Sequence, residues 1–219
     1  MKAIIFDVDG VLVDSYRAHL ESWQMLAREA GVTFTEEDFA RTFGRTSRDI
    51  LLECFDANLD DAALRALDDR KEALYREIVA DSFPAMPGAA ELIRALDHDG
   101  WSIAAGSSGP PENVELCLAQ LGVRVAFDAV ITGRDVTRGK PDPQVFQLAA
   151  QRMNAPADRC IVVEDAPAGL EAARRAGMHR VVFVSTARTE QELLDADLRI
   201  KSFDEISADQ LARLLEHRP

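Results

Sequence analysis

The chain has 219 residues, of which 47% are hydrophobic and 29% are charged. This is enough for one large domain or for a core with a smaller insert, and it excludes a disordered tail or a fibrous repeat. Acidic residues outnumber basic ones by 38 to 25, so the formal net charge is -13. Such a charge repels nucleic acid, and it means that any site for a phosphorylated molecule needs a local cation.

The cysteines and the first residues indicate a cellular compartment. Cys54, Cys117 and Cys160 have neither CxxC spacing nor a Cys/His pattern of metal ligands, so we interpret them as small buried side chains in a reducing compartment. Asp7 and Asp9 interrupt the apolar run at the N-terminus before it reaches signal-peptide length. We therefore expect a cytoplasmic protein that does not associate with a membrane.

Five short apolar runs are typical of strands that are buried on both faces of a sheet. In chain order they cover residues 3–6, 101–105, 129–132, 160–163 and 181–184. Segments of helical period follow most of them, over residues 89–97, 112–121, 143–153 and 168–176. This alternation predicts an α/β fold with a doubly wound, Rossmann-like parallel sheet and right-handed crossovers.

One region after the first strand breaks this alternation. Its only regular features are amphipathic helical stretches, which we expect at residues 18–30, 47–55 and 61–79. The Pro- and Gly-rich residues 83–88 read as a linker whose counterpart lies near residues 13–16. We predict an α/β core domain of residues 1–15 and 84–219, and a small α-helical domain, residues 16–83, inserted into it.

Polar residues follow several of the predicted strands, at the sheet edge where doubly wound folds bind their ligands. Four carboxylates gathered there would repel one another unless a hard cation lay between them, and oxygen ligands suit Mg²⁺. The sequence therefore predicts a Mg²⁺ site at this edge. The residues concerned are Asp7 and Asp9, Ser107 and Ser108, Lys140, and Glu164 and Asp165.

The same segments resemble a known family. Asp-x-Asp-Gly-Val-Leu-x-Asp-Ser, Gly-Ser-Ser, Gly-Lys-Pro-Asp-Pro and Val-Glu-Asp-Ala-Pro-Ala-Gly are similar to the four motifs of the haloacid dehalogenase-like (HAD) phosphohydrolases. The branch that the chain resembles contains β-phosphoglucomutase, phosphoglycolate phosphatase and small sugar-phosphate phosphatases, and it carries a cap domain where the helical insert falls. The resemblance implies a Mg²⁺-dependent phosphatase of a small phosphorylated metabolite, a sugar or polyol phosphate, that acts through an aspartyl-phosphate.

The resemblance also implies roles for the residues that match the motifs. Asp7 would be the nucleophile, and Asp9 would be the general acid and then the general base. Because they stand two residues apart on a segment that we expect to be extended, both side chains would project to the same side. Mg²⁺ would be held by Asp7, by the backbone carbonyl of Asp9, by Asp165, and by Glu164 directly or through water.

The remaining motif residues would hold the phosphoryl group. The resemblance implies this role for Lys140 and Ser107, with Ser108 beside them. Simpler interpretations stay open: Lys140 could be an ordinary surface lysine, and the two serines could cap the next helix. A helix cap also accounts for Asp14 and Ser15 at the end of the first motif.

The insert supplies further candidates for substrate binding. Residues 44–48, Gly-Arg-Thr-Ser-Arg, resemble a substrate-specificity loop, which brings in Arg45 and Arg48. His19 and Trp23 match positions that β-phosphoglucomutases use near their site, and Lys71 resembles a substrate-contacting lysine. The alternatives are a loop that caps the next helix with solvated arginines, a packed helix face, and a solvated lysine.

Two other functions compete with a phosphatase. A phosphomutase would share the core residues, but the mutases it resembles have a lysine where this chain has Phe43. A non-catalytic binding module on the same fold would have lost one of its motif residues, and all are present. Dehalogenases and phosphonatases of the superfamily lack the equivalent of Asp9. We expect a monomer, since an inserted domain on two linkers must open and close.

Overall fold

The computed structural model describes residues 1–42, 45–184 and 196–217. The chain divides into two compact units, one made of Met1–Asp14 with Pro84–Pro219 and the other made of Ser15–Phe83. We call them the α/β unit and the helical unit. The two segments that lead out of and back into the α/β unit pair with each other, through an antiparallel bridge between Val13 and Ala85.

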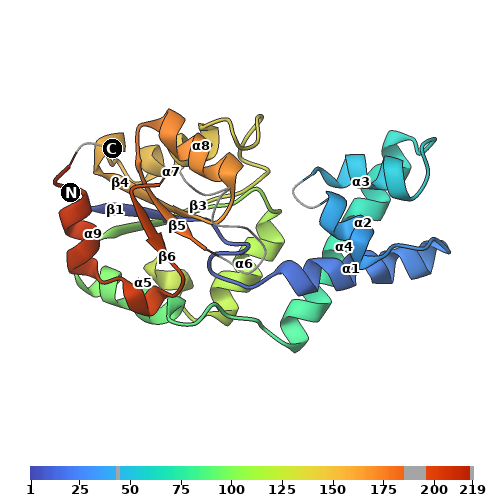
Figure 1. Cartoon of the computed structure of the whole chain (residues 1–219), viewed down its shortest axis with the longest axis horizontal. Helices are drawn as coiled ribbons and strands as arrows, with labels where there is room; N and C mark the ends of the chain where they lie inside the picture. Colours follow the sequence, from blue (N-terminus) through green and yellow to red (C-terminus); the bar gives the residue numbers. More distant parts are fainter. Residues whose placement is uncertain (43–44, 185–195, 218–219) are drawn as a thin grey trace. The chain divides into compact units, whose positions relative to one another are not determined.

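A parallel sheet is the centre of the α/β unit, and six strands of the described chain form it in the order β3-β2-β1-β4-β5-β6 (Figure 1). This confirms the doubly wound sheet. The sixth strand was not predicted, because it is a short edge strand in which only Ile200 is buried. The strands are β1 (Ala3–Phe6), β2 (Ser102–Gly106), β3 (Ala129–Ile131), β4 (Cys160–Glu164), β5 (His179–Phe183) and β6 (Leu198–Ile200).

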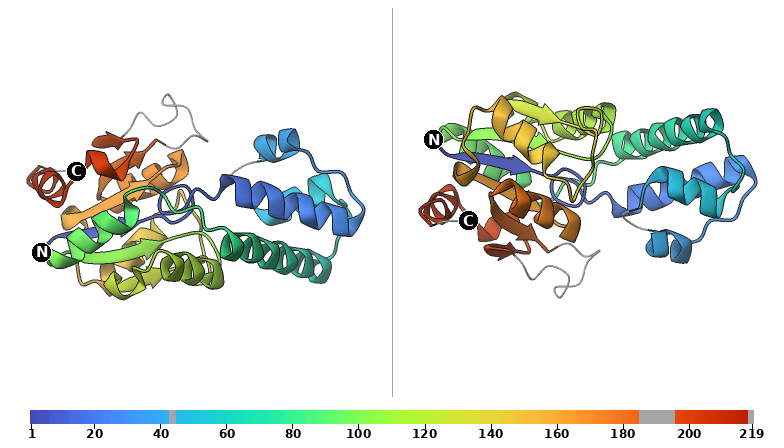
Figure 2. Two further views of the ribbon diagram at one scale, coloured as in Figure 1. Left: turned by 90° about the horizontal axis from the view of Figure 1, so that it is seen from below. Right: turned by 90° about the horizontal axis from the view of Figure 1, so that it is seen from above.

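Helices cover both faces of this sheet, as Figures 1 and 2 show. On one face, α7 (Gln144–Arg152) contacts β1, β2 and β3, and α8 (Pro167–Ala176) contacts β4 and β5. The other face carries α5 (Ala89–His98), α6 (Pro111–Gln120) and α9 (Ala208–Leu214). Short 3₁₀ turns η1 (Arg124–Ala126), η2 (Ala157–Arg159) and η4 (Phe203–Glu205) complete the described elements. Since both faces are covered, β1 and β4 are buried along their whole length.

The register of the central strands positions the functional edge. Phe6, the last residue of β1, pairs with Ala105 of β2 on one side and with Val163 of β4 on the other. The Asp7 N–H donates to the Val163 carbonyl at 2.9 Å, which extends the β1–β4 ladder by one bond. The residues that follow β1, β2 and β4 therefore emerge side by side, at the point where the strand order reverses.

The helical unit contains α1 (Tyr16–Ala30), α2 (Glu36–Thr42), α3 (Ser47–Cys54) and α4 (Asp61–Asp81). Helix α4 packs against α1 and α3, and its N-cap Asp60 accepts hydrogen bonds from the Ala62 and Ala63 amides. The apolar face of α1, with Leu20, Trp23 and Leu26, lies in the core of this unit. Helix α2 was not predicted, because most of its seven residues are polar. None of the helices described here is both long enough and apolar enough to cross a bilayer.

Candidate active site

Three carboxylates meet at the carboxyl ends of β1 and β4. Asp7 directly follows β1, Glu164 is the last residue of β4, and Asp165 follows it. One oxygen from each of them lies within 4.8 Å of the others. Their residues are 8%, 1% and 7% exposed, so water screens their mutual repulsion very little. The structure thus brings together three of the four acidic residues that the sequence placed at this edge.

Lys140 supplies the positive charge of this cluster. Its Nζ donates to Asp7 Oδ1 at 2.8 Å and to Glu164 Oε1 at 2.6 Å. The lysine side chain is only 9% exposed, and Nζ lies 5.0 Å from the centre of the Phe146 ring. The interpretation of Lys140 as an ordinary surface lysine is therefore wrong, because its charge is buried between two carboxylates.

Glu164 is held on both of its oxygens. While Oε1 accepts from Lys140, Oε2 accepts from the backbone amides of Asp165 and Ala166, both at 2.8 Å. A Cβ at Gly169 would overlap the Glu164 carboxylate, so only glycine fits on the first turn of α8 there. The Glu164 side chain consequently anchors Lys140 to the end of β4.

Burial and neighbouring charges act in opposite directions on the pKa values of this cluster. Burial raises the pKa of Asp7 well above its usual value; Lys140 opposes this shift, and Glu164 and Asp165 add to it. For Lys140, burial acts to lower the pKa, but the carboxylates of Asp7 and Glu164 outweigh it and raise the pKa. Three buried carboxylates with oxygens within 4.8 Å of one another offer the ligands that a hard divalent cation such as Mg²⁺ prefers.

The segment after Asp7 is not extended, contrary to the prediction. The chain bends at Val8, whose carbonyl accepts from the Leu12 and Val13 amides, so strand alternation does not apply to Asp9. Asp9 is half-buried, and its carboxylate lies beside Gly109 in the loop after β2. The tight turn at Gly10 has a φ of 77°, and a Cβ there would overlap the Asp165 carboxylate.

The serines of the β2 loop do not cap the next helix. Helix α6 has Pro110 at its N-cap and no side-chain cap bond, so that alternative is wrong. Ser107 is buried, donates its N–H to the Ile131 carbonyl, and accepts at Oγ from the Gly109 amide at 3.0 Å. Ser108 is exposed. The cap interpretation also fails at Ser15, which makes no side-chain cap bond to α1.

The helical unit has a pocket of its own, of about 170 Å³. It gathers the predicted His19, Trp23, Arg45 and Lys71, whereas Arg48 does not line it and pairs with Asp61 at 2.8 Å. Lys71 is not a solvated helix charge, because its side chain is only 4% exposed. The remaining lining residues are Phe39, Ser47 and Ile50, none of which was predicted as a site residue.

For the predicted specificity loop, the helix-capping alternative holds at one residue. Thr46 does cap α3, because its side chain accepts from the Asp49 amide. Phe43, which distinguishes this chain from the mutases, and Gly44 lie outside the described residues.

Comparisons of the sequence and the fold with known proteins identify the family of the chain. A family model described as a haloacid dehalogenase-like hydrolase matches residues 1–177. The chain is 32% identical to validoxylamine A 7'-phosphate phosphatase of Streptomyces hygroscopicus subsp. limoneus, over 94% of this chain and 95% of that protein. It is 30% identical to β-phosphoglucomutase of Bacillus subtilis, over 96% and 94%. The structure of a family IA, variant 3 HAD hydrolase from Entamoeba histolytica matches with a TM-score of 0.88 and 26% identity, over 99% of this chain and 100% of that one.

Proposed function

The chain belongs to the haloacid dehalogenase-like hydrolases, and from that premise we propose that it is a Mg²⁺-dependent phosphatase of a small phosphorylated metabolite, a sugar or polyol phosphate. The observation that carries the proposal is the buried bridge from Lys140 to Asp7 and Glu164, with Asp165 beside it. It combines a carboxylate nucleophile, a fixed cation and a group of carboxylate oxygens that suits a divalent ion.

In the proposed reaction, a carboxylate oxygen of Asp7 forms a bond to the phosphorus while the bond from phosphorus to the ester oxygen breaks. Asp9 gives a proton to the departing oxygen, and the product is an alcohol with an aspartyl-phosphate on Asp7. Asp9 then takes a proton from a water molecule, whose oxygen bonds to the phosphorus while the bond from phosphorus to the Asp7 oxygen breaks, which restores the Asp7 carboxylate and releases inorganic phosphate. Lys140 and Ser107 hold the phosphoryl oxygens in place, which limits the cost of orienting them.

We propose that Asp7 and Asp165 hold the Mg²⁺ ion directly, together with the backbone carbonyl of Asp9. Both oxygens of Glu164 already accept hydrogen bonds, so we assign it contact with the ion through water and a direct role in fixing Lys140. A bound ion would neutralise charge on the phosphoryl oxygens, so that the anionic Asp7 carboxylate could approach the phosphorus.

We assign substrate selection to the helical unit, as the cap domain of this branch. Its pocket offers an aromatic wall from Trp23 and polar groups from His19, Arg45 and Lys71, which suits a hydroxyl-bearing metabolite. This assignment covers residues 16–83 of the chain and leaves the bond-breaking chemistry to the α/β unit.

The direct test is hydrolysis of p-nitrophenyl phosphate and of a panel of sugar, polyol and nucleotide monophosphates, with Mg²⁺ and with EDTA. We expect phosphate release that requires Mg²⁺ and favours polyol or sugar esters. Conversion of β-glucose 1-phosphate to glucose 6-phosphate in the presence of the bisphosphate, without phosphate release, would instead establish a phosphomutase. No turnover at high enzyme concentration would favour a binding module.

A further inference from the structure

The pocket of the helical unit carries two cations, and both are already paired. Its apolar wall comes from Trp23, Phe39 and Ile50, and its polar lining includes two basic side chains, Arg45 and Lys71. Two positive charges facing one small pocket would suit a phosphate group. The partners of these two side chains decide whether that charge is available.

Lys71 is neutralised inside the unit. Its Nζ lies 2.8 Å from Glu72 Oε1 and 2.9 Å from His19 Nδ1. Because an ammonium group only donates, His19 Nδ1 is the acceptor in this bond. The Lys71 and Glu72 side chains are 4% and 16% exposed, so they form a largely buried ion pair. An anion that binds Lys71 would therefore come close to a largely buried carboxylate.

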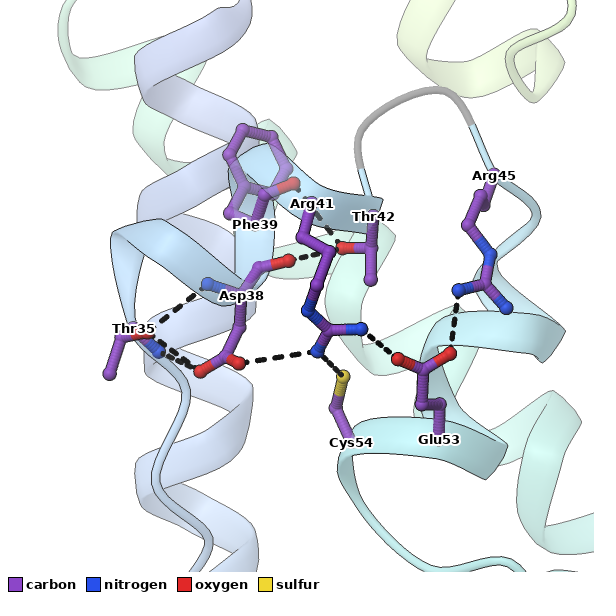
Figure 3. A network of polar contacts seen from close by, with 8 residues as sticks. All are labelled: Thr35, Asp38, Phe39, Arg41, Thr42, Arg45, Glu53 and Cys54. Carbon is purple, nitrogen blue, oxygen red and sulfur yellow. Dashed lines mark hydrogen bonds and ion pairs between the residues drawn. The ribbon is translucent and has the colours of Figure 1, made fainter.

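Arg45 is held in the same way by a residue outside the pocket lining. Its Nη1 donates to Glu53 Oε2 at 2.6 Å, and the other oxygen of Glu53 accepts from Arg41, as Figure 3 shows. Arg41 also pairs with Asp38 at 3.3 Å. The four side chains form a row of alternating charge, Asp38, Arg41, Glu53 and Arg45, in which acids and bases are equal in number. Arg45 therefore reaches the pocket with its charge balanced.

We propose that Glu53 is a positioning residue which keeps Arg45 paired, so that the pocket accepts an uncharged polyhydroxyl chain and rejects a second phosphate. The inference rests on the proposed function, in which the helical unit contacts the part of the substrate that does not react. It narrows the substrate to a monophosphate ester of a polyol or sugar.

Hydroxyl groups suit paired side chains for a simple reason. Each hydroxyl can accept from Arg45 or Lys71 and donate to a carboxylate, so the ion pairs stay intact while the ligand's hydrogen bonds are satisfied. A phosphate dianion only accepts. It must draw the two cations away from Glu53 and Glu72, and it then meets both carboxylates as like charges.

The test compares two substrates that differ only in the second phosphate, mannitol 1-phosphate and mannitol 1,6-bisphosphate, by the rate of phosphate release. For the wild type we expect kcat/KM to favour the monophosphate by about tenfold or more. In Glu53→Gln the carboxylate charge is gone and Arg45 can turn to the ligand, so this preference falls about tenfold, mainly through a lower KM for the bisphosphate.

Two further variants separate selectivity from damage to the fold. Glu77→Gln makes the same exchange in the exposed pair of Glu77 with Arg70, which does not line the pocket, and it keeps the wild-type preference. Arg41→Gln leaves Glu53 to Arg45 alone, so the preference for the monophosphate rises. This second variant tests the proposal even if Glu53→Gln does not fold.

Either of two results overturns the inference: a wild type that hydrolyses the bisphosphate as readily as the monophosphate, or an Arg41→Gln preference that falls as Glu53→Gln is expected to do. Failure of the proposed function looks different, because the wild type would then release no phosphate from either mannitol ester or from p-nitrophenyl phosphate in Mg²⁺.

Discussion

The two polar regions of this molecule pair their charges in different ways. At the strand ends of the α/β unit, Lys140 pairs with both Asp7 and Glu164, and Asp165 lies beside them. In the pocket of the helical unit, each cation has at least one carboxylate partner. The first region gathers three carboxylates and so favours a metal ion, whereas the second pairs each of its two basic residues with a carboxylate and favours hydroxyl groups. Composition alone, with its net charge of -13, does not separate these two cases.

The two regions also differ in how the fold brings their residues together. The acidic cluster depends on strand register, because Asp7 and Glu164 stand 157 positions apart in the chain but on adjacent strands. The pocket depends on helix packing, since α1 supplies His19 and Trp23 and α4 supplies Lys71.

Removal of the nucleophile should have the largest effect. We expect Asp7→Asn to lower kcat by about 10⁴-fold or more, because an amide cannot form the aspartyl-phosphate. Asp14→Asn is the matched control, since Asp14 follows in the same motif but is exposed, and it should retain wild-type activity. Steady-state phosphate release measures both variants, with circular dichroism as the check on folding. A wild-type rate in Asp7→Asn would remove the proposed nucleophile.

Removal of the cation that bridges Asp7 and Glu164 should have the next largest effect. Lys140→Met leaves Asp7 and Glu164 buried without their partner, and we expect a loss of about 3–5 kcal/mol in the free energy of unfolding in EDTA. Added Mg²⁺ should restore part of this loss. Arg138→Met, which breaks an exposed pair with Asp142, should cost less than about 1 kcal/mol. Urea unfolding measures the loss in both variants. Equal losses in Lys140→Met and Arg138→Met would mean that the buried Lys140 charge does not stabilise Asp7 and Glu164.

The sequence predicts the sheet better than it predicts the chain just beyond it. Buried strands such as residues 3–6 have an apolar pattern that is typical of a covered parallel sheet, and β1 has the predicted bounds. The bend at Val8 was missed, because it depends on amides that turn back to the Val8 carbonyl and not on side-chain pattern. The missed bend did not affect the prediction that Asp7 and Asp165 lie close together, because that prediction depends on the strand ends and the motifs.

Burial and pairing of basic residues could not be predicted in the same way. In the sequence, Lys71, Arg45 and Arg48 are three charged residues on helices or a loop, yet the first is buried, the second lines the pocket and the third pairs away from it. The partners Glu53 and Glu72 carry no motif. Helix packing brings Glu53 and Glu72 to these basic residues. In the sequence, the one sign of this pairing is that acidic residues occur near Arg45 and Lys71.

Metal binding should stabilise the α/β unit by a smaller amount. A ligand at about 100 times its Kd adds about 2.7 kcal/mol to the free energy of unfolding, so Mg²⁺ should raise the Tm of the wild type by several degrees. Asp165→Asn should abolish most of this rise, while Asp99→Asn, an exposed carboxylate after α5, should keep it. Thermal melting in EDTA and in Mg²⁺ measures the difference. An equal rise in Asp165→Asn would show that the ion binds without that residue.

We expect the smallest effect on stability from His179. It is a buried ionisable group outside both the acidic cluster and the pocket, so it serves as a reference for these two regions. It is 1% exposed, its Nε2 has no hydrogen-bond partner among the described residues, and burial lowers its pKa despite the opposing charge of Asp197. The unfolded chain therefore takes up a proton at a higher pH than the folded protein does. The stability that neutral His179 contributes is present above its usual pKa and is lost as the pH falls from there towards the lowered value.

On this reasoning, the wild type should lose up to about 1 kcal/mol more than His179→Gln does when the pH falls from about 7.5 to about 5.5. His98→Gln is the matched control, since His98 is exposed at the end of α5, and it should show the pH dependence of the wild type. Urea unfolding at the two pH values gives the comparison. If His179→Gln and the wild type lost the same free energy of unfolding between the two pH values, burial would not be what keeps the His179 imidazole neutral. The contrast with Lys140, whose buried charge is stabilised by two carboxylates, would then lose its physical basis.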